Sequence, residues 1–118
     1  MGFIRNETTT SDMFKHVYTN VSKDELERKI NTLLTSWGYK SKGIENESTI
    51  FEKGNRTARI LLGAFVKYSK ISVRVTVIGQ NELICEVRSL SSGISGGLIG
   101  INQVKTEIRN LFTAFQSF

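Results

Sequence analysis

The chain of 118 residues contains no proline, a single cysteine, Cys85, and a single histidine, His16. One cysteine cannot form an internal disulfide, so packing alone must stabilise the fold, and an intracellular, cytoplasmic setting is the simplest interpretation. Catalytic Ser-His-Asp or Cys-His groups and multi-histidine metal sites would have to borrow residues from another subunit. We therefore expect no enzyme, no metal and no cofactor. We also expect His16 at the surface or a sheet edge, and Cys85 in the core.

Long hydrophobic runs are also missing. Charged or polar residues interrupt every apolar stretch within about ten positions, whereas a membrane span needs at least about 18 consecutive apolar residues. Residues 1–12 lack the hydrophobic stretch that is typical of a secretory signal. With 39% hydrophobic residues, the chain can bury one modest core. These features predict a small soluble protein that makes no membrane contact.

The N-terminal residues 1–13 form a polar, threonine-rich segment in which Phe3 and Ile4 are the early apolar residues. The segment shows neither a strand period nor a helix period, so we expect a flexible, disordered or loosely held tail there, with docking through Phe3 and Ile4 as an alternative. The rest of the chain, residues 14–118, is expected to form a single domain. The β-branched and aromatic residues between Met13 and Thr19 predict a short edge strand at its start.

The first helix is predicted over residues 22–37 from a strong local signature. Ser22 and Glu25 have the spacing of a capping box, in which each residue can satisfy a backbone amide of the first turn. Gly38 supplies the left-handed residue that commonly ends a helix, and residues 39–43 are expected to be a connection. Apolar residues recur at helical spacing at Leu26, Ile30, Leu33, Leu34 and Trp37.

Strands are predicted over residues 47–53, 70–78 and 82–90, where β-branched and apolar residues cluster or alternate. The segment 57–68 is nearly continuously apolar. It fits a buried strand, which we favour, or a helical turn interrupted by Gly63.

The hairpin between residues 70 and 90 has a register that can be predicted from parity. A two-residue loop at positions 80 and 81 would place Val75 on the same face as Glu86 and bury a charge. A three-residue loop at 79–81 keeps all apolar residues on one face and sets Arg74 opposite Glu86. The expected pairs are Val77 with Leu83, Val75 with Cys85, and Val73 with Val87.

A second amphipathic helix is predicted to begin near Asn102, a suitable N-cap residue, and to lie on the sheet. The pattern as a whole predicts an α+β fold with a single antiparallel sheet of three to four strands. We expect two helices, one before and one after the strands, packed on one face of that sheet.

The glycine-rich stretch 91–101 joins the last predicted strand to the second helix. Backbone amides near a helix start favour anions, so Ser95, Gly96 and Gly97 are a candidate anion loop. The stretch lacks the Gly-Lys-Ser/Thr ending of a phosphate-binding P-loop. Its apolar residues, such as Leu98, favour a packed strand-to-helix joint instead.

The net charge is +5, and the basic surplus lies in the middle of the chain, where residues 53–81 include no acidic residue. Basic residues interleaved with aromatic rings are typical of nucleic-acid surfaces. The candidate residues for nucleic-acid or other anion binding are Arg56, Arg59, Lys67, Lys70 and Arg74.

Three functional hypotheses follow from these features. The first is a non-catalytic domain that binds a protein partner or a second copy of itself through exposed sheet edges, so that a homodimer is plausible. The second is a nucleic-acid or other polyanion binder that uses the basic segment 53–74. The third is a site for a small phosphate or nucleotide at the glycine-rich stretch.

Overall fold

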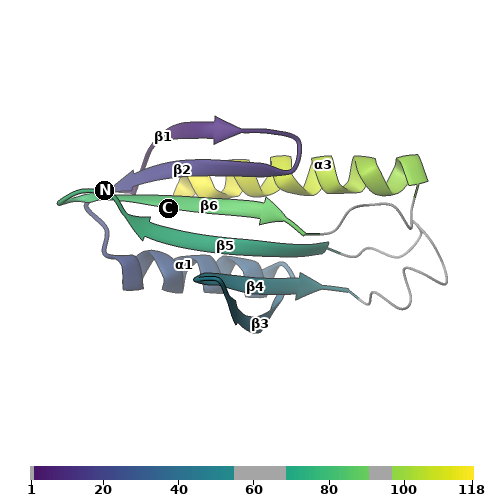
Figure 1. Cartoon of the computed structure of the whole chain (residues 1–118), viewed down its shortest axis with the longest axis horizontal. Helices are drawn as coiled ribbons and strands as arrows, with labels where there is room; N and C mark the ends of the chain where they lie inside the picture. Colours follow the sequence, from purple (N-terminus) through teal and green to yellow (C-terminus); the bar gives the residue numbers. More distant parts are fainter. Residues whose placement is uncertain (1, 55–68, 91–96) are drawn as a thin grey trace.

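The structure is a computed structural model that describes residues 2–54, 69–90 and 97–118, with residues 97–104 described by their backbone. Within these residues, six antiparallel strands form one sheet in the order β1-β2-β6-β5-β4-β3 (Figure 1). The elements are β1 (Gly2–Thr9), β2 (Met13–Thr19), α1 (Lys23–Ser36), β3 (Lys40–Glu45), β4 (Ser48–Lys53), β5 (Ser69–Val77), β6 (Glu82–Ser89), α3 (Gly97–Ala114) and the short 3-10 helix η3 (Phe115–Ser117).

The α+β class and the antiparallel sheet are confirmed, but two parts of the predicted fold are wrong. The described sheet has six strands rather than three to four. The helices do not stand one before and one after the strands, because β1 and β2 precede α1 and four described strands, β3 to β6, lie between α1 and α3. The strands missed from the sequence, β1 and β3, are the two edges of the sheet. Most of their residues are exposed, so they lack the alternating apolar pattern that predicts a strand.

β1 occupies residues for which the polar composition predicts a flexible tail. It pairs with β2, and the Phe3 amide donates a hydrogen bond of 2.7 Å to the Phe118 carbonyl oxygen. The Phe3 ring packs edge-on against His16 and Tyr18, with ring centroids 4.7 and 6.0 Å apart. Because β1 covers it, β2 is an interior strand between β1 and β6 and not the edge strand that was expected.

α1 confirms the predicted helix almost to the residue. The Ser22 side-chain oxygen accepts a hydrogen bond of 3.1 Å from the Glu25 amide, as a capping residue should. Gly38 has a φ of +93°, the left-handed conformation expected after a helix. The connection predicted over residues 39–43 is wrong, because β3 begins at Lys40.

The β5–β6 hairpin has the predicted register. Val77 pairs with Leu83, Val75 with Cys85 and Val73 with Val87, and Arg74 lies opposite Glu86 on the other face. The cause is the alternation of apolar and charged residues, because a one-residue shift of the register would carry charged residues to the buried face. Cys85 is fully buried, as predicted.

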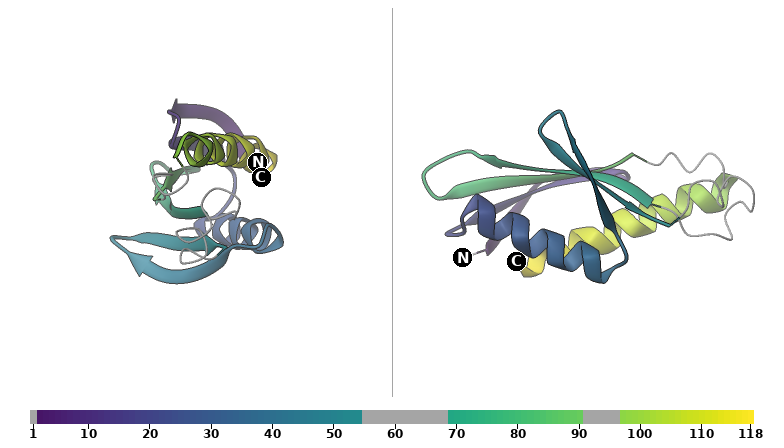
Figure 2. Two further views of the ribbon diagram at one scale, coloured as in Figure 1. Left: turned by 90° about the vertical axis from the view of Figure 1, so that its right-hand side faces the viewer. Right: turned by 90° about the horizontal axis from the view of Figure 1, so that it is seen from below.

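Both described helices, α1 and α3, lie on the same face of the sheet, and neither lies on the opposite face (Figure 2). α1 contacts β5, whereas α3 contacts β2 and β6, so each helix covers a different half of the sheet. The core between the helices and the sheet consists of Phe14, Tyr18, Leu26, Ile30, Leu34, Tyr39, Phe51, Ile71, Val73, Val75, Leu83, Cys85, Val87, Ile108, Leu111 and Phe115.

α3 begins at Gly97, which corrects the predicted start near Asn102. Gly97 belongs to the glycine-rich stretch, so part of the expected joint is helical backbone. The segment 57–68, for which strand and helix were both considered, lies outside the described residues. Neither α1 nor α3 combines the length and the apolar character that a helix needs to cross a lipid bilayer.

The Ser22 cap can be tested with Ser22→Ala. Removing the acceptor of the Glu25 amide is expected to lower the free energy of unfolding by about 0.5–2 kcal/mol, measured by urea denaturation. Lys29→Ala, at an exposed position of the same helix, is the control and should change stability by less than about 0.5 kcal/mol. Equal effects of the two substitutions would contradict a stabilising role for the cap.

Candidate functional site

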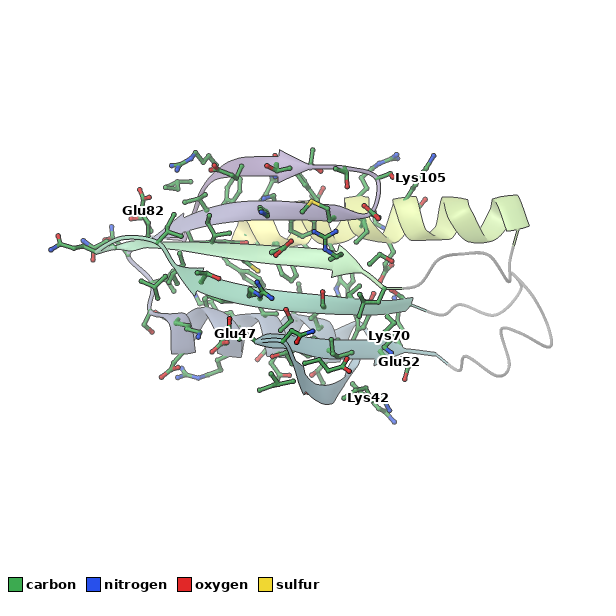
Figure 3. The ribbon with its side chains drawn as sticks, in the orientation of Figure 1. Lys42, Glu47, Glu52, Lys70, Glu82 and Lys105 are labelled. Carbon is green, nitrogen blue, oxygen red and sulfur yellow. The ribbon has the colours of Figure 1, made fainter. Side chains whose placement is uncertain are left out.

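The predicted anion-binding residues are described in part. Arg56, Arg59 and Lys67 lie outside the described residues, whereas Lys70 and Arg74 lie on β5. Their spacing puts both on the face of the sheet opposite to α1 and α3. Each lies opposite a glutamate of a neighbouring strand, Lys70 opposite Glu52 and Arg74 opposite Glu86. Figure 3 shows Lys70 beside Glu52, so the described part of this face alternates charges of both signs.

Arg74 is held by hydrogen bonds within the protein. Its Nε donates to Ser48 Oγ at 3.3 Å, and its Nη2 donates to the Asn46 carbonyl oxygen at 2.7 Å. Asn46 and Glu47 have φ values of +51° and +68°, which identify them as the central pair of a tight hairpin turn between β3 and β4. Arg74 therefore anchors this turn to β5.

A hollow of about 240 Å³ surrounds Arg74 on the open face of the sheet. Its lining includes Glu45 and Glu86 as well as Arg88, whose Nη2 lies 2.9 Å from Glu86 Oε2. This mixture of charges offers a polyanion no uniformly basic surface. The polyanion hypothesis stays a prediction that depends on residues outside the described part.

The candidate anion loop is also described in part. Ser95 and Gly96 lie outside the described residues, and Gly97 is the first residue of α3. The loop stays a prediction, as does the alternative that it is a packed joint.

His16 is fully buried, which contradicts its expected surface or edge position. Its Nε2 lies 3.0 Å from the Phe112 carbonyl oxygen, and its Nδ1 lies 3.2 Å from Asn6 Nδ2. Because a carbonyl accepts but cannot donate, Nε2 carries the proton and Nδ1 accepts from the Asn6 amide. The ring therefore links β1, β2 and α3 as a neutral side chain. Burial lowers the pKa of His16, although its hydrogen bonds to the backbone oppose that shift.

Cys85 lies opposite His16 on the neighbouring strand, a pairing that the sequence did not reveal. A catalytic cysteine needs an accessible thiolate and a base that can take its proton. Here burial raises the pKa of the Cys85 thiol, and both nitrogens of His16 have other partners. The two side chains therefore pack as part of the core. Within the described residues, no three His, Cys, Asp or Glu side chains gather in a group that could hold a metal ion.

A polar cluster of Tyr39, Lys53, Ser69 and Glu107 joins α3 to the sheet. Glu107 Oε2 accepts hydrogen bonds from the Tyr39 hydroxyl at 2.5 Å and from Lys53 Nζ at 2.7 Å. The Tyr39 oxygen also lies 2.7 Å from Ser69 Oγ, and Lys53 Nζ lies 4.8 Å from the centre of the Tyr39 ring. Burial is the main cause that raises the pKa of Tyr39, and the hydrogen bond to Glu107 raises it further. Tyr39 is thus a neutral donor that anchors Glu107.

The hollow between α1 and β3, which we call the β3 groove, has a volume of about 290 Å³. Its floor is made by core residues of β4 and β5, its walls by α1 and β3, and most of its lining is apolar. The apolar lining residues are Ile30, Ile44, Phe51, Val73 and Val75, and the polar ones are Glu27, Asn31, Ser41 and Thr49.

β3 itself is an open edge. It is the last strand of the described sheet, all six of its residues are exposed, and the β3–β4 hairpin projects from the body of the molecule (Figure 2). The strand contains a bulge between Ser41 and Gly43, where Gly43 has a φ of +116°. After this bulge Ile44 points toward the groove with 73% of its surface exposed, more than any other large hydrophobic residue described.

Comparison with known proteins adds no further evidence: no family model matches this chain, and no match is found among curated proteins or solved structures. The candidate functional site follows from the geometry of the described residues. β3 and the β3 groove bring together open backbone groups and an apolar hollow, which is the combination that an added strand can use.

The polar cluster can be tested with Tyr39→Phe. Loss of the hydroxyl removes a buried donor from the Glu107 carboxylate, so the free energy of unfolding should fall by about 1.5–3 kcal/mol in urea denaturation. Thr113→Ala, at an exposed position of α3, is the control and should change stability far less. A Tyr39→Phe protein as stable as the control would show that the cluster does not hold the helix.

His16 should make stability depend on pH. The pKa of His16 is lowered in the folded protein, so the unfolded chain binds more protons than the folded protein as the pH falls through about 6.5. Lower pH therefore stabilises the unfolded state relative to the folded state. The free energy of unfolding should therefore fall between about pH 7.5 and 5.5, above the range in which most carboxylates titrate. His16→Gln, which keeps a donor and an acceptor but does not titrate, should flatten this dependence. An equal slope in both proteins would contradict the assignment.

Proposed function

We propose that this protein is a non-catalytic binding domain that associates with a second copy of itself through β3. The observation that carries this proposal is the open strand beside an apolar groove, with Ile44 exposed between them. Exposed edge strands present unpaired backbone groups that pair readily with another strand.

The charges of β3 are complementary to those of a second, antiparallel copy. When the twofold axis passes between Lys42 and Gly43, Lys40 lies opposite Glu45 of the second copy, and the same contact repeats on the other side of the axis. Cross-strand pairs of opposite charge contribute about 0.2–1 kcal/mol each. The sequence of this strand, Lys-Ser-Lys-Gly-Ile-Glu, thus favours its own reversed copy.

The bulge in β3 makes this register consistent with a continuous sheet. In a regular strand, residues 40 and 45 would point to opposite faces. The extra residue between Ser41 and Gly43 changes that parity: Lys40 and Glu45 pair with the open-face residues Glu52 and Ser48, and Ser41 and Ile44 both line the groove. Paired as proposed, the two sheets join with their helices on the same side.

The β3 groove adds the apolar part of the contact. In the proposed register, Ile44 lies opposite Ser41 of the second copy, at the wall of that copy's groove. Burying Ile44 removes the most exposed large hydrophobic residue described from water. Two six-residue strands bury less area than a standard stable interface, so we expect a weak, reversible dimer.

The other edge of the sheet is less suited to pairing. β1 has two register irregularities, and its exposed Arg5 and Glu7 form an ion pair with each other at 3.6 Å. Irregular, charged edges are a common means by which proteins avoid strand addition. On β3, the lysines and the bulge disfavour pairing with most other strands, but they are complementary to β3 of a second, antiparallel copy.

The proposal predicts a monomer–dimer equilibrium in sedimentation velocity between about 5 and 500 μM protein. Lys40→Glu and Glu45→Lys should each weaken the dimer about three- to tenfold, because like charges then meet twice across the axis. The double exchange should restore the dimer to within about twofold of the original affinity. Ile44→Lys should also weaken it, since it removes the apolar contact.

Val77→Lys is the matched control, because Val77 is 60% exposed but lies at the end of β5. This substitution should leave the association unchanged. A protein that stays monomeric over the whole concentration range would refute self-association. A dimer that is insensitive to both single charge changes would show that it uses a different surface.

A further inference from the structure

A second hollow lies at the other side of the molecule, between α3 and the turn that joins β1 to β2. This turn hollow has a volume of about 280 Å³ and is lined by Thr9, Thr10, Ser11, Lys105, Ile108, Arg109 and Phe112. Figure 3 shows Lys105 on α3, near the point where β1 turns into β2. The hollow is separate from β3, which is the opposite edge of the sheet.

The lining of the turn hollow divides into an apolar floor and a cationic rim. Ile108 is almost completely buried and Phe112 is half-buried, so both present apolar surface at the bottom. Lys105 and Arg109 are exposed and stand one helical turn apart on the same face of α3. On the opposite side, the hydroxyl groups of Thr9 and Ser11 can donate hydrogen bonds, whereas the Thr10 hydroxyl donates to Asp12.

The two cations have no acidic partner among the residues that the structure describes. The carboxylate of Asp12, in the same turn as Thr10 and Ser11, accepts a hydrogen bond of 2.8 Å from the Thr10 hydroxyl and forms no ion pair with Lys105 or Arg109. On α3, Glu107 lies between Lys105 and Arg109 in sequence, but it bonds to Tyr39 and Lys53 on another face of the helix. Among the described residues, the rim thus places two cations that form no ion pair beside an apolar surface.

We propose that the turn hollow binds a small amphiphilic carboxylate, a molecule with a short aliphatic body and one anionic end. The aliphatic body lies on Ile108 and Phe112, and the carboxylate meets Lys105 and Arg109. Arginine suits this role because its planar guanidinium can donate two parallel hydrogen bonds to a carboxylate. The volume lies just below the range of about 300–1,000 Å³ for drug-sized ligands, so the ligand is small.

Octanoate is a suitable probe, and its binding can be followed by ¹H–¹⁵N NMR titration of the whole chain. We expect saturable binding at millimolar concentration or below, with shifts centred on residues 9–11 and 105–112. Octanol lacks the charge and acetate lacks the apolar body, so both should bind far more weakly. Octyl phosphate distinguishes the head groups, and the proposal expects it to bind no better than octanoate.

Variants separate this site from general surface charge. Lys105→Ala and Arg109→Ala should each weaken octanoate binding about threefold, and the double variant about tenfold, as for solvent-exposed charge contacts. Lys23→Ala with Arg28→Ala removes the same charge from α1 and should have no effect. Absence of saturable octanoate binding, equal binding of octanol, or an unaffected double variant would each overturn the proposal.

Discussion

The carboxylate of Glu107 is the contact on which the arrangement of the two helices depends. It receives the Tyr39 hydroxyl from the segment after α1 and the Lys53 ammonium from the end of β4, while Glu107 itself belongs to α3. Each helix covers its own half of the sheet, so this largely buried cluster fixes one helix relative to the other. α1 forms a wall of the β3 groove and α3 forms a wall of the turn hollow, so both surfaces depend on the same carboxylate. Loss of one partner from such a cluster is costly because it leaves a poorly solvated charge.

Elements that are determined by neighbouring residues could be predicted from the sequence. The Ser22 cap and Gly38 define α1 because both act on backbone groups within one turn of the helix. The β5–β6 register follows from alternation and the length of the turn, since a one-residue shift would bury Glu86 or expose the valines. Cys85 was placed in the core by the same alternation. In each case, the information lies within a few positions of the chain.

The remaining features depend on contacts between distant residues. His16 looks like an edge residue until β1 covers β2, which requires the docking of a polar segment that carries no strand period. Tyr39 and Glu107 are 68 positions apart, and no local pattern connects them. In the candidate site, alternation predicts Val73 and Val75, which line the β3 groove, as core residues. The sequence of β3 predicts a connection instead of a strand, because none of its residues is buried. An exposed strand gives no hydrophobic signal, although it is the element most available to a partner.

The buried histidine also gives the protein a built-in spectroscopic reporter. Because His16 is the sole histidine of the chain, its ring gives one set of imidazole resonances without selective labelling. One ring nitrogen senses Asn6 on β1 and the other senses the backbone of Phe112, whose side chain also lines the turn hollow. Detachment of the edge strand would therefore perturb one nitrogen, and a displacement of α3 the other. The resonances of this one side chain thus distinguish the opening of β1 from the displacement of α3, which methods that follow global unfolding do not resolve.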